Sequence, residues 1–178
     1  MIYLLRHPRP AIEEGICFGA LDLELAEPVE PLIAKLRPLL PERYTLYSSP
    51  LKRALAVAEH FGEPIIEPRL REMDFGEWEG QDYASIAASY AEWALDIYGF
   101  RPPGGESAAE MAARACAFIR EARCPRPYLI VAHAGPIRAI IADQLGLRPE
   151  DALRFRVDFG SLSAVHEGEL VFLNHIPR

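Results

Sequence analysis

Two histidines stand directly after short apolar segments, and one of them has an arginine beside it. Arg6 and His7 follow residues 1–5, and His133 follows residues 128–132. A neutral imidazole is a nucleophile near pH 7, and a guanidinium group binds two phosphate oxygens at once. Neighbouring positive charges favour the neutral form of a histidine. These residue types therefore suit phosphoryl transfer with a histidine as the nucleophile.

A further arginine and several carboxylates extend this set. Arg53 lies in the first turn of an expected helix whose N-cap is Ser49. Phosphoryl transfer releases an alkoxide, which a nearby carboxylic acid can protonate. Glu72 is a candidate for this acid, and it competes with Asp74 and Glu77 in the same loop.

Alternating strands and helices are expected to position these groups. Apolar runs predict strands and helical spacing predicts helices. The expected strands are residues 1–5, 45–48, 65–67, 128–132 and two strands within 163–174, and the expected helices are residues 28–40, 49–61, 83–98, 107–123 and 135–146. This order predicts one domain over residues 1–178, a three-layer α/β/α fold whose mostly parallel sheet has an antiparallel edge strand.

The carboxyl ends of the parallel strands are the expected binding edge, because ligands of open α/β sheets bind there. Polar groups follow three of these strands, at residues 6–7, 48–49 and 133–135. Two of the three ends lead into helices, and a helix N-terminus presents free N–H groups and positive potential to an anion. Together the three ends predict a phosphate site.

Bulk properties narrow the class of protein. The chain has 178 residues and a formal net charge of −7, which argues against a nucleic-acid partner. It contains no apolar run of about 18 residues, and its first residues lack the features of a secretory signal, so no membrane partner is expected. Three cysteines without metal-type spacing favour a reduced compartment, and a cytoplasmic location is expected. Helix contacts or the terminal hairpin could form a homodimer, which the sequence does not decide.

Five sequence blocks resemble, in order, those of the histidine phosphatase superfamily, which includes the cofactor-dependent phosphoglycerate mutases. The blocks are LLRHPRP at 4–10, SSPLKRA at 48–54, LREMDFGEWEG at 70–80, PPGGES at 102–107 and VAHAGPIR at 131–138. The resemblance implies a phosphoglycerate mutase-like fold and a phosphatase that needs neither a metal nor another cofactor. Its partner would be a small phosphorylated substrate.

The resemblance also implies roles for single residues. It makes His7 the phosphorylated nucleophile and Glu72 the general acid that later activates water. His133 would share in catalysis. The phosphate would be held by Arg6, Arg53, His133 and the backbone N–H of Ala134.

The stretch GICFGALDLEL at 15–25 is similar to one in the α-ribazole phosphatase branch. It favours a phosphomonoesterase acting on α-ribazole 5′-phosphate or another small ester, with selectivity set by residues 8–25 and 81–100. A phosphoglycerate mutase is the first alternative. A non-catalytic phosphate-binding module is the second, because Pro8 replaces the family's glycine and lacks its N–H. A metal-dependent phosphatase using Glu72, Asp74 and Glu77 is the weakest.

Overall fold

The computed structural model describes residues 1–177 and contains a six-stranded sheet in the order β3-β2-β4-β1-β5-β6. The strands are β1 (Ile2–Arg6), β2 (Thr45–Ser48), β3 (Ile65–Ile66), β4 (Tyr128–Ala132), β5 (Leu162–His166) and β6 (Glu169–His175). Strands β1 to β4 pair in parallel, whereas β5 is antiparallel to β1 and to β6. The predicted mostly parallel sheet with an antiparallel edge is confirmed, and the C-terminal hairpin forms that edge.

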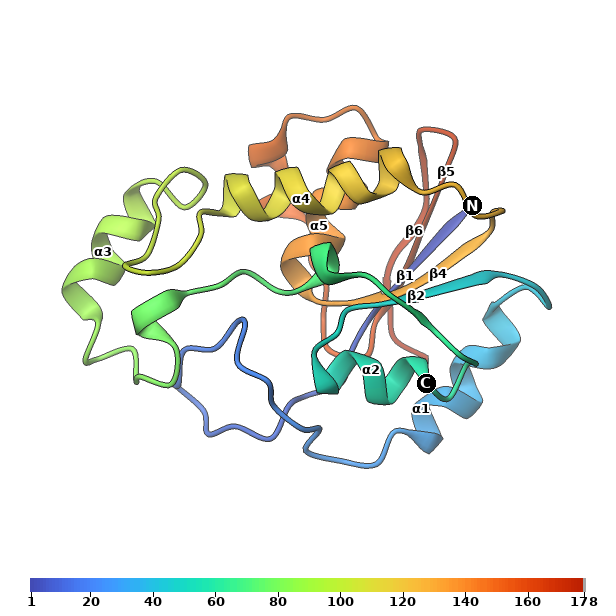
Figure 1. Ribbon diagram of the computed structural model, residues 1–178, viewed down its shortest axis with the longest axis horizontal. Coiled ribbons are helices and arrows are strands. Elements are labelled where there is room, and N and C mark those ends of the chain that lie inside the picture. The colour runs from blue at the N-terminus through green and yellow to red at the C-terminus, as the bar shows by residue number, and fades with distance from the viewer. Residues whose placement is uncertain (178) are drawn as a thin grey trace.

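Helices cover both faces of the sheet, as the alternation of apolar side chains requires. Along β4, Tyr128, Ile130 and Ala132 pack on one face with α4 (Ala108–Glu121) and α5 (Ala134–Gln144). Leu129 and Val131 pack on the other face with α1 (Glu30–Leu36) and α2 (Lys52–Ala58). Figure 1 shows these two pairs of helices above and below the strands, which confirms the three-layer arrangement.

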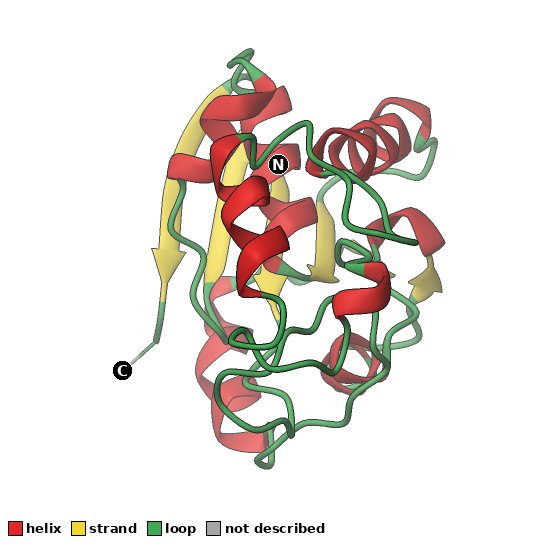
Figure 2. Ribbon diagram, turned by 90° about the vertical axis from the view of Figure 1, so that its left-hand side faces the viewer, coloured by secondary structure: helices red, strands yellow, loops and turns green. Residues whose placement is uncertain are grey.

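The carboxyl ends of β2, β4 and β1 lie side by side, because these strands are neighbours in the sheet. Arg6 pairs with Ala132 in the register, so His7 and His133 leave adjacent strands at the same level. Long loops and α3 (Ala87–Leu95) gather beyond this edge on the left of Figure 1, and Figure 2 looks onto them.

Helix boundaries differ from the prediction at several places. The segment 28–40 is α1 followed by a short 3₁₀ turn, Arg37–Leu39. α2 begins at Lys52 with Leu51 as N-cap, so the prediction of Ser49 as N-cap is wrong. α3 begins later than predicted, at Ala87. Asp82 accepts hydrogen bonds from the backbone N–H and the hydroxyl of Ser85, and these bonds hold residues 82–85 in a turn before the helix.

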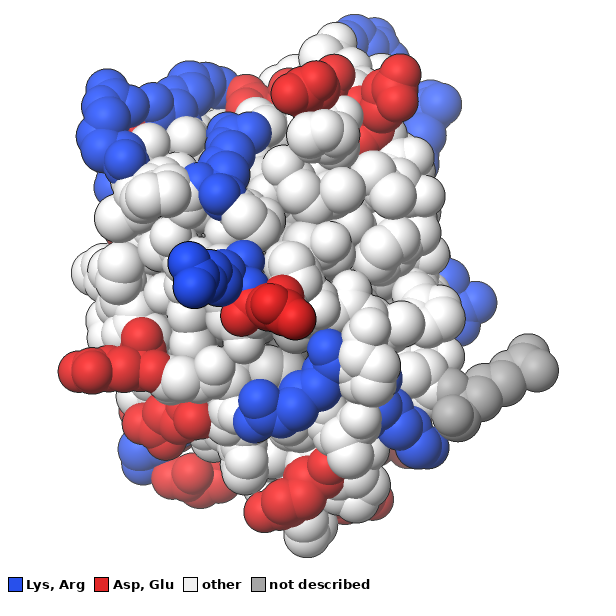
Figure 3. All heavy atoms as spheres, turned by 90° about the vertical axis from the view of Figure 1, so that its right-hand side faces the viewer, with Lys and Arg blue, Asp and Glu red and all other residues white. Residues whose placement is uncertain are grey.

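Two features at the C-terminal half complete the fold. The predicted capping box between Ser107 and Glu110 is present at the start of α4. A 3₁₀ helix over Pro149–Arg154 was not predicted, and it packs against α5. Within residues 1–177, no helix combines the length and apolar character that crossing a membrane requires. Figure 3 shows that acidic and basic side chains are interspersed on the face opposite the long loops.

Candidate active site

His7, His133 and Arg53 meet at the carboxyl edge of the sheet. The ring centroids of His7 and His133 are 4.9 Å apart, and Nε of Arg53 lies 3.1 Å from Nε2 of His7. All three side chains are buried, with exposed fractions of 1%, 0% and 0% for His7, Arg53 and His133. The strand ends thus bring together the two imidazoles and one of the guanidinium groups that the sequence singled out.

The hydrogen bonds of His7 define its tautomer. Its Nδ1 atom lies 2.5 Å from the carbonyl oxygen of Pro8, and a carbonyl can only accept. Nδ1 therefore carries the proton, and Nε2 keeps a lone pair that accepts the bond from Nε of Arg53. Pro8 lacks the N–H of a glycine but supplies the carbonyl that orients the ring, so this replacement leaves the orienting contact in place.

The surroundings keep both imidazoles uncharged. Burial lowers the pKa of His7 well below its usual range, and the positive charges of Arg53 and Arg6 lower it further. Burial also lowers the pKa of His133, followed by the effects of His7 and Arg53. Burial is thus a larger cause than the neighbouring arginines, which were the expected cause.

The guanidinium group of Arg53 is held by the loop that precedes α1. Its two terminal nitrogens donate to the carbonyl oxygens of Leu21 at 2.6 Å and Gly19 at 2.5 Å. With the bond from Nε to His7, each of the three guanidinium nitrogens donates one hydrogen bond. The position of Arg53 beside the imidazole therefore depends on the path of residues 19–21.

Glu79 holds the same loop from the other side. Its carboxylate accepts hydrogen bonds from the backbone N–H groups of residues 19, 20 and 21, at 3.1, 2.7 and 2.9 Å. It also accepts one from the N–H of Phe75 at 3.0 Å. Gly19 is required here, since a Cβ at that position would lie 2.0 Å from the carbonyl oxygen of Met73. Residues 19–21 thus donate their N–H groups to Glu79, and two of their carbonyl oxygens accept from Arg53.

Two polar atoms near the histidines have no partner among residues 1–177. Nε2 of His133 lies 2.8 Å from Oγ of Ser49, but its Nδ1 is buried without a partner. Nε of Arg6 is buried and unpartnered as well, although another nitrogen of this group donates to the carbonyl oxygen of Val157 at 2.7 Å. Buried polar groups without partners are costly, and an oxygen of a bound anion would supply an acceptor to the Nε–H of Arg6 and, in the tautomer that carries its proton on Nδ1, to His133.

Glu72 approaches the N-terminus of α5. Its carboxylate accepts from the backbone N–H of Gly135, with distances of 3.1 and 3.3 Å to its two oxygens, and from that of Met73 at 3.1 Å. A Cβ on Gly135 would lie 2.4 Å from Oε1 of Glu72, so only glycine allows this approach. The negative charge of Glu72 also acts on Arg6, where it opposes the lowering of the pKa by burial.

The competing carboxylates lie elsewhere. Asp74 accepts from the backbone N–H of Gly76 at 2.8 Å, and Glu77 is exposed. Of the three, only Glu72 lines the cavity that opens beside Arg6 and Arg138. In the part of the chain that the structure describes, no three His, Cys, Asp or Glu side chains are grouped as metal ligands would be.

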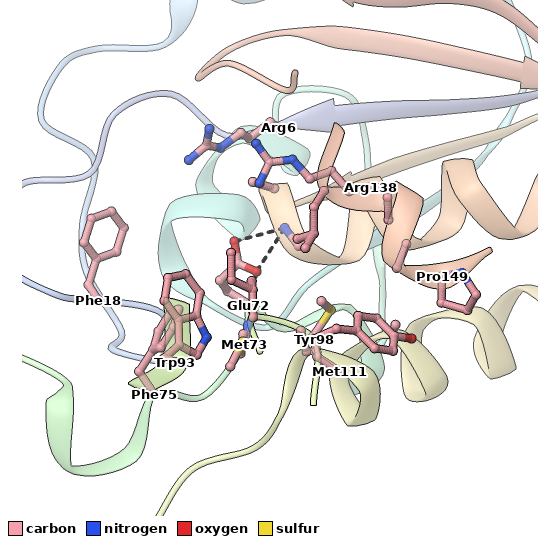
Figure 4. Close-up of a pocket in the computed structure, with 18 of the residues that line it drawn as sticks. Arg6, Phe18, Glu72, Met73, Phe75, Trp93, Tyr98, Met111, Arg138 and Pro149 are labelled. Carbon is pink, nitrogen blue, oxygen red and sulfur yellow. Dashed lines mark hydrogen bonds between the residues drawn. The ribbon is translucent and has the colours of Figure 1, made fainter. Parts of the chain in front are cut away.

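A cavity of about 470 Å³ opens next to these groups. Its polar part is formed by Arg6, Glu72, Ala134, Gly135 and Arg138, whereas His7, Arg53 and His133 are not among its lining residues. Figure 4 shows the Arg6 and Arg138 guanidinium groups above the Glu72 carboxylate. The remaining wall is mainly apolar, with Phe18, Phe75, Tyr83, Trp93, Ile97, Tyr98, Met111, Pro149 and Leu153 among its residues. The segments 8–25 and 81–100, where selectivity was expected, both contribute to it.

Sequence reasoning missed four contributors to this arrangement. It gave no role to Ser49 as the partner of His133, to Glu79, to Arg138, or to Phe159, whose ring centroid lies 3.7 Å from the Arg6 guanidinium carbon. Arg138 stands inside the block VAHAGPIR, one turn after Ala134, and this spacing is a signal that could have identified it. No local pattern could have identified Phe159.

The chain resembles known phosphatases over most of its length. The family model of the histidine phosphatase superfamily, branch 1, matches residues 2–170. Phosphoserine phosphatase 1 of Hydrogenobacter thermophilus is 32% identical over 85% of this chain and 78% of its own. Glucosyl-3-phosphoglycerate phosphatase of Mycolicibacterium vanbaalenii is 31% identical over 82% of this chain and 74% of its own.

Solved structures agree with this relationship. The α-ribazole phosphatase of Shigella flexneri superposes with a TM-score of 0.86 and 26% identity, covering 99% of this chain and 96% of that one. The matched family model spans the two histidines, Arg53 and Glu72 as well as most of the sheet. The chain belongs to the histidine phosphatase superfamily.

Proposed function

We propose that the protein is a phosphomonoesterase that transfers a phosphoryl group from a small phosphate ester to Nε2 of His7 and then to water. The observation that carries this proposal is the state of that atom: Nδ1 is bonded to the Pro8 carbonyl, so Nε2 is unprotonated. The low pKa of His7, caused first by burial, keeps it so at neutral pH. A nucleophile in this state needs no separate base.

The first step forms an N–P bond and breaks the ester P–O bond. The phosphate binds between Arg6, Arg53 and His133. The Nε–H group of Arg53 then donates its hydrogen bond to a phosphoryl oxygen in place of Nε2 of His7, which frees that atom to attack phosphorus. The backbone N–H of Ala134, which has no acceptor inside α5, donates to another oxygen. The step starts from the form of the enzyme in which Glu72 is protonated and not ionised, and this carboxylic acid gives its proton to the departing ester oxygen, so the leaving group departs as an alcohol.

The second step reverses the use of the same carboxylate. Glu72, now ionised, takes a proton from a water molecule while the water oxygen attacks phosphorus. The N–P bond breaks, inorganic phosphate leaves, and His7 returns to its neutral Nδ1-protonated form. In both steps the positive charges of Arg6 and Arg53 stabilise the negative charge on the equatorial oxygens. The proposal requires no metal ion.

A His7→Ala variant tests this mechanism with p-nitrophenyl phosphate as the substrate. We expect kcat to fall by at least about 10³-fold, because removing a covalent nucleophile leaves only transition-state binding. Quenching the wild-type protein during turnover should trap an acid-labile phosphohistidine, and a chelator should leave its rate unchanged. The exposed His166→Ala variant is the control. Full activity of His7→Ala contradicts the mechanism, and a rate abolished by the chelator supports the metal-dependent alternative.

The products that the protein forms distinguish a phosphatase from the alternative functions. Incubation with 3-phosphoglycerate and a bisphosphoglycerate primer should release inorganic phosphate, whereas isomerisation without release would make the protein a mutase. α-Ribazole 5′-phosphate remains a candidate substrate, supported by the stretch 15–25 and by the similarity to the Shigella enzyme. Absence of turnover on every ester would favour a non-catalytic phosphate-binding module.

A further inference from the structure

The block PPGGES at 102–107 contributes no group to the proposed mechanism, yet it packs closely against the loop that carries Glu72. The backbone N–H of Glu106 donates to the carbonyl oxygen of Asp74 at 2.9 Å, and the Glu106 carboxylate accepts from the N–H of Asp74 at 3.0 Å. A Cβ on Gly105 would lie 2.4 Å from the same carbonyl oxygen, so this close approach requires glycine. The block therefore holds the segment that directly follows Glu72.

Arg114 holds the same loop from α4. Its Nη1 atom donates to the carbonyl oxygens of Arg69 at 2.6 Å and Arg71 at 2.8 Å, and its Nη2 atom donates to that of Glu72 at 3.0 Å. Its Nε and Nη2 atoms donate to the two carboxylate oxygens of Glu106. A guanidinium group has five N–H donors, and here each of the five has an acceptor. The side chain is thus committed to one carboxylate and to three carbonyl groups of the loop.

Glu106 and Arg114 form an ion pair of low exposure. Their side chains are 21% and 23% exposed, and two parallel hydrogen bonds join them. Removing two charges from water costs about as much as their attraction returns, so such a pair adds little net stability. The pair does fix a geometry, because each partner orients the other and together they bond to the backbone of Glu72 and of Asp74.

The position of Glu72 depends on these contacts, because residues 71–75 belong to neither a helix nor a strand. Its carboxylate accepts from the N–H of Gly135 at the start of α5, as the dashed lines in Figure 4 show. Its backbone is fixed from the other side by Arg114. A general acid must lie within hydrogen-bond reach of the departing oxygen, and a displacement of about 1 Å can lower a rate roughly 10²-fold.

We propose that Arg114 and Glu106 position the general acid, by fixing the backbone of Glu72 so that its carboxyl group meets the oxygen of the leaving group. This inference rests on the proposed function, in which Glu72 is that acid. Arg114 is not among the residues that line the cavity, and its donors bond to the loop and to Glu106. It is therefore a positioning residue and not a catalytic one.

Two aryl phosphates of similar shape test the inference. p-Nitrophenolate leaves without a proton, whereas phenol is a much weaker acid and its oxygen needs one. The ratio of kcat/KM on p-nitrophenyl phosphate to kcat/KM on phenyl phosphate therefore rises when the acid works poorly, and loss of folded protein lowers both values equally. We expect Arg114→Met to raise this ratio roughly 10-fold, and Glu106→Gln to raise it less. Arg114→Lys keeps the charge without the planar fork and should lie between Arg114→Met and the wild type.

Two control variants separate positioning from charge and from stability. Arg120→Met removes the same charge from the same helix, at an exposed ion pair. Ile33→Val removes a buried methyl group on the opposite face of the sheet, which lowers stability at a distance from the loop. Both should leave the ratio as it is in the wild type, and urea unfolding measures the stability of each variant. If Arg114→Met does not fold, Arg114→Lys and Glu106→Gln give the same comparison.

Combination with Glu72→Gln shows whether Arg114 acts through the acid. Glu72→Gln alone should raise the ratio, and adding Arg114→Met should raise it no further. The inference is overturned by a wild-type ratio in the Arg114 and Glu106 variants, by an equal rise in Ile33→Val, or by independent effects that multiply in the double variant. Failure of the proposed function looks different: the wild-type protein would hydrolyse neither aryl ester and form no phosphohistidine, or Glu72→Gln would itself keep the wild-type ratio.

Discussion

Nε of Arg53 donates to Nε2 of His7 across 3.1 Å, so the same hydrogen bond marks the nucleophilic atom and the cation beside it. The other two nitrogens of Arg53 are fixed by the carbonyl oxygens of Gly19 and Leu21. A planar fork satisfies all three acceptors at once, which a lysine ammonium group on a flexible chain does not reproduce. The geometry of the fork, and not its charge alone, therefore holds the site in order.

Arg53→Lys should consequently reduce activity although it preserves the charge. We expect kcat/KM for p-nitrophenyl phosphate to fall by roughly 10²-fold, the effect of removing one preorganised donor from a transition state. Steady-state kinetics measure this loss, and Arg120→Lys, which makes the same substitution at an exposed ion pair, is the control. Equal activity of Arg53→Lys and wild type would mean that charge alone is sufficient.

Glu79 is expected to act on the site through the loop 19–21. A glutamine at this position has one acceptor oxygen in place of two, and its amide group would face backbone donors. We expect Glu79→Gln to lower the free energy of unfolding by roughly 1–3 kcal/mol, the cost of leaving buried donors without partners. Because the loop also holds Arg53, kcat/KM should fall at temperatures where the variant is fully folded.

Glu77, which lies in the same turn as Glu79, provides the control for this prediction. Glu77→Gln removes an equal charge from an exposed side chain and should change neither stability nor kinetics. Urea unfolding and p-nitrophenyl phosphate kinetics on both variants give the comparison. A Glu79→Gln variant that loses stability but keeps wild-type kcat/KM would show that the loop does not position Arg53.

Glu72→Gln should separate the two proposed steps by the quality of the leaving group. An alkyl phosphate needs protonation of its leaving oxygen, so its kcat should fall by about 10²–10⁴-fold. p-Nitrophenolate leaves without a proton, so the first step continues in this variant. Because the attack of water is then slow, we expect a burst of p-nitrophenol release, during which phosphohistidine accumulates. Rapid-quench kinetics detect both. Asp74→Asn is the control, and a burst in that variant instead would move the acid's role to Asp74.

The sequence predicted the strands well because their ends are set by local signals. Tyr128–Ala132 is a short apolar run, and Thr45–Ser48 ends at two polar residues. Parallel strands place their carboxyl ends together, so His7, Arg53 and His133 could be expected to converge without knowledge of the loops. Resemblance to the family added Glu72, which composition left in competition with its neighbours.

The conformations of the loops could not be predicted from local sequence patterns, because their contacts join residues that are far apart in the sequence. Ser49 and His133, which share a hydrogen bond, are 84 residues apart in the sequence. Glu79 is about 60 residues away from the N–H groups of residues 19–21 that it binds. α2 begins later than predicted because the backbone of Leu51 is extended, with φ −68° and ψ 133°. The hydroxyl of Ser49 still accepts from the N–H of Leu51 at 3.3 Å and lies 2.8 Å from Nε2 of His133, but the helix does not continue through Leu51.

The stability of the protein should depend on pH through the two buried imidazoles. Burial lowers the pKa values of His7 and His133 in the folded state, whereas in the unfolded chain both return to about 6.5. Above this pH neither state binds the protons, so the histidines add no pH dependence. Below it the unfolded state binds them and the folded state does not, so the free energy of unfolding falls as the pH decreases.

The slope should approach about 1.4 kcal/mol per pH unit for each histidine below pH 6. Urea unfolding at pH 5 to 8 measures it, and His7→Asn or His133→Asn should each remove about half of the slope, whatever the variant does to stability at pH 8. His166→Asn alters an exposed ring and should leave the slope as it is in the wild type. A slope that persists unchanged in both His7→Asn and His133→Asn would mean that these imidazoles bind protons below pH 6 in the folded protein as they do in the unfolded chain, and that other groups cause the slope.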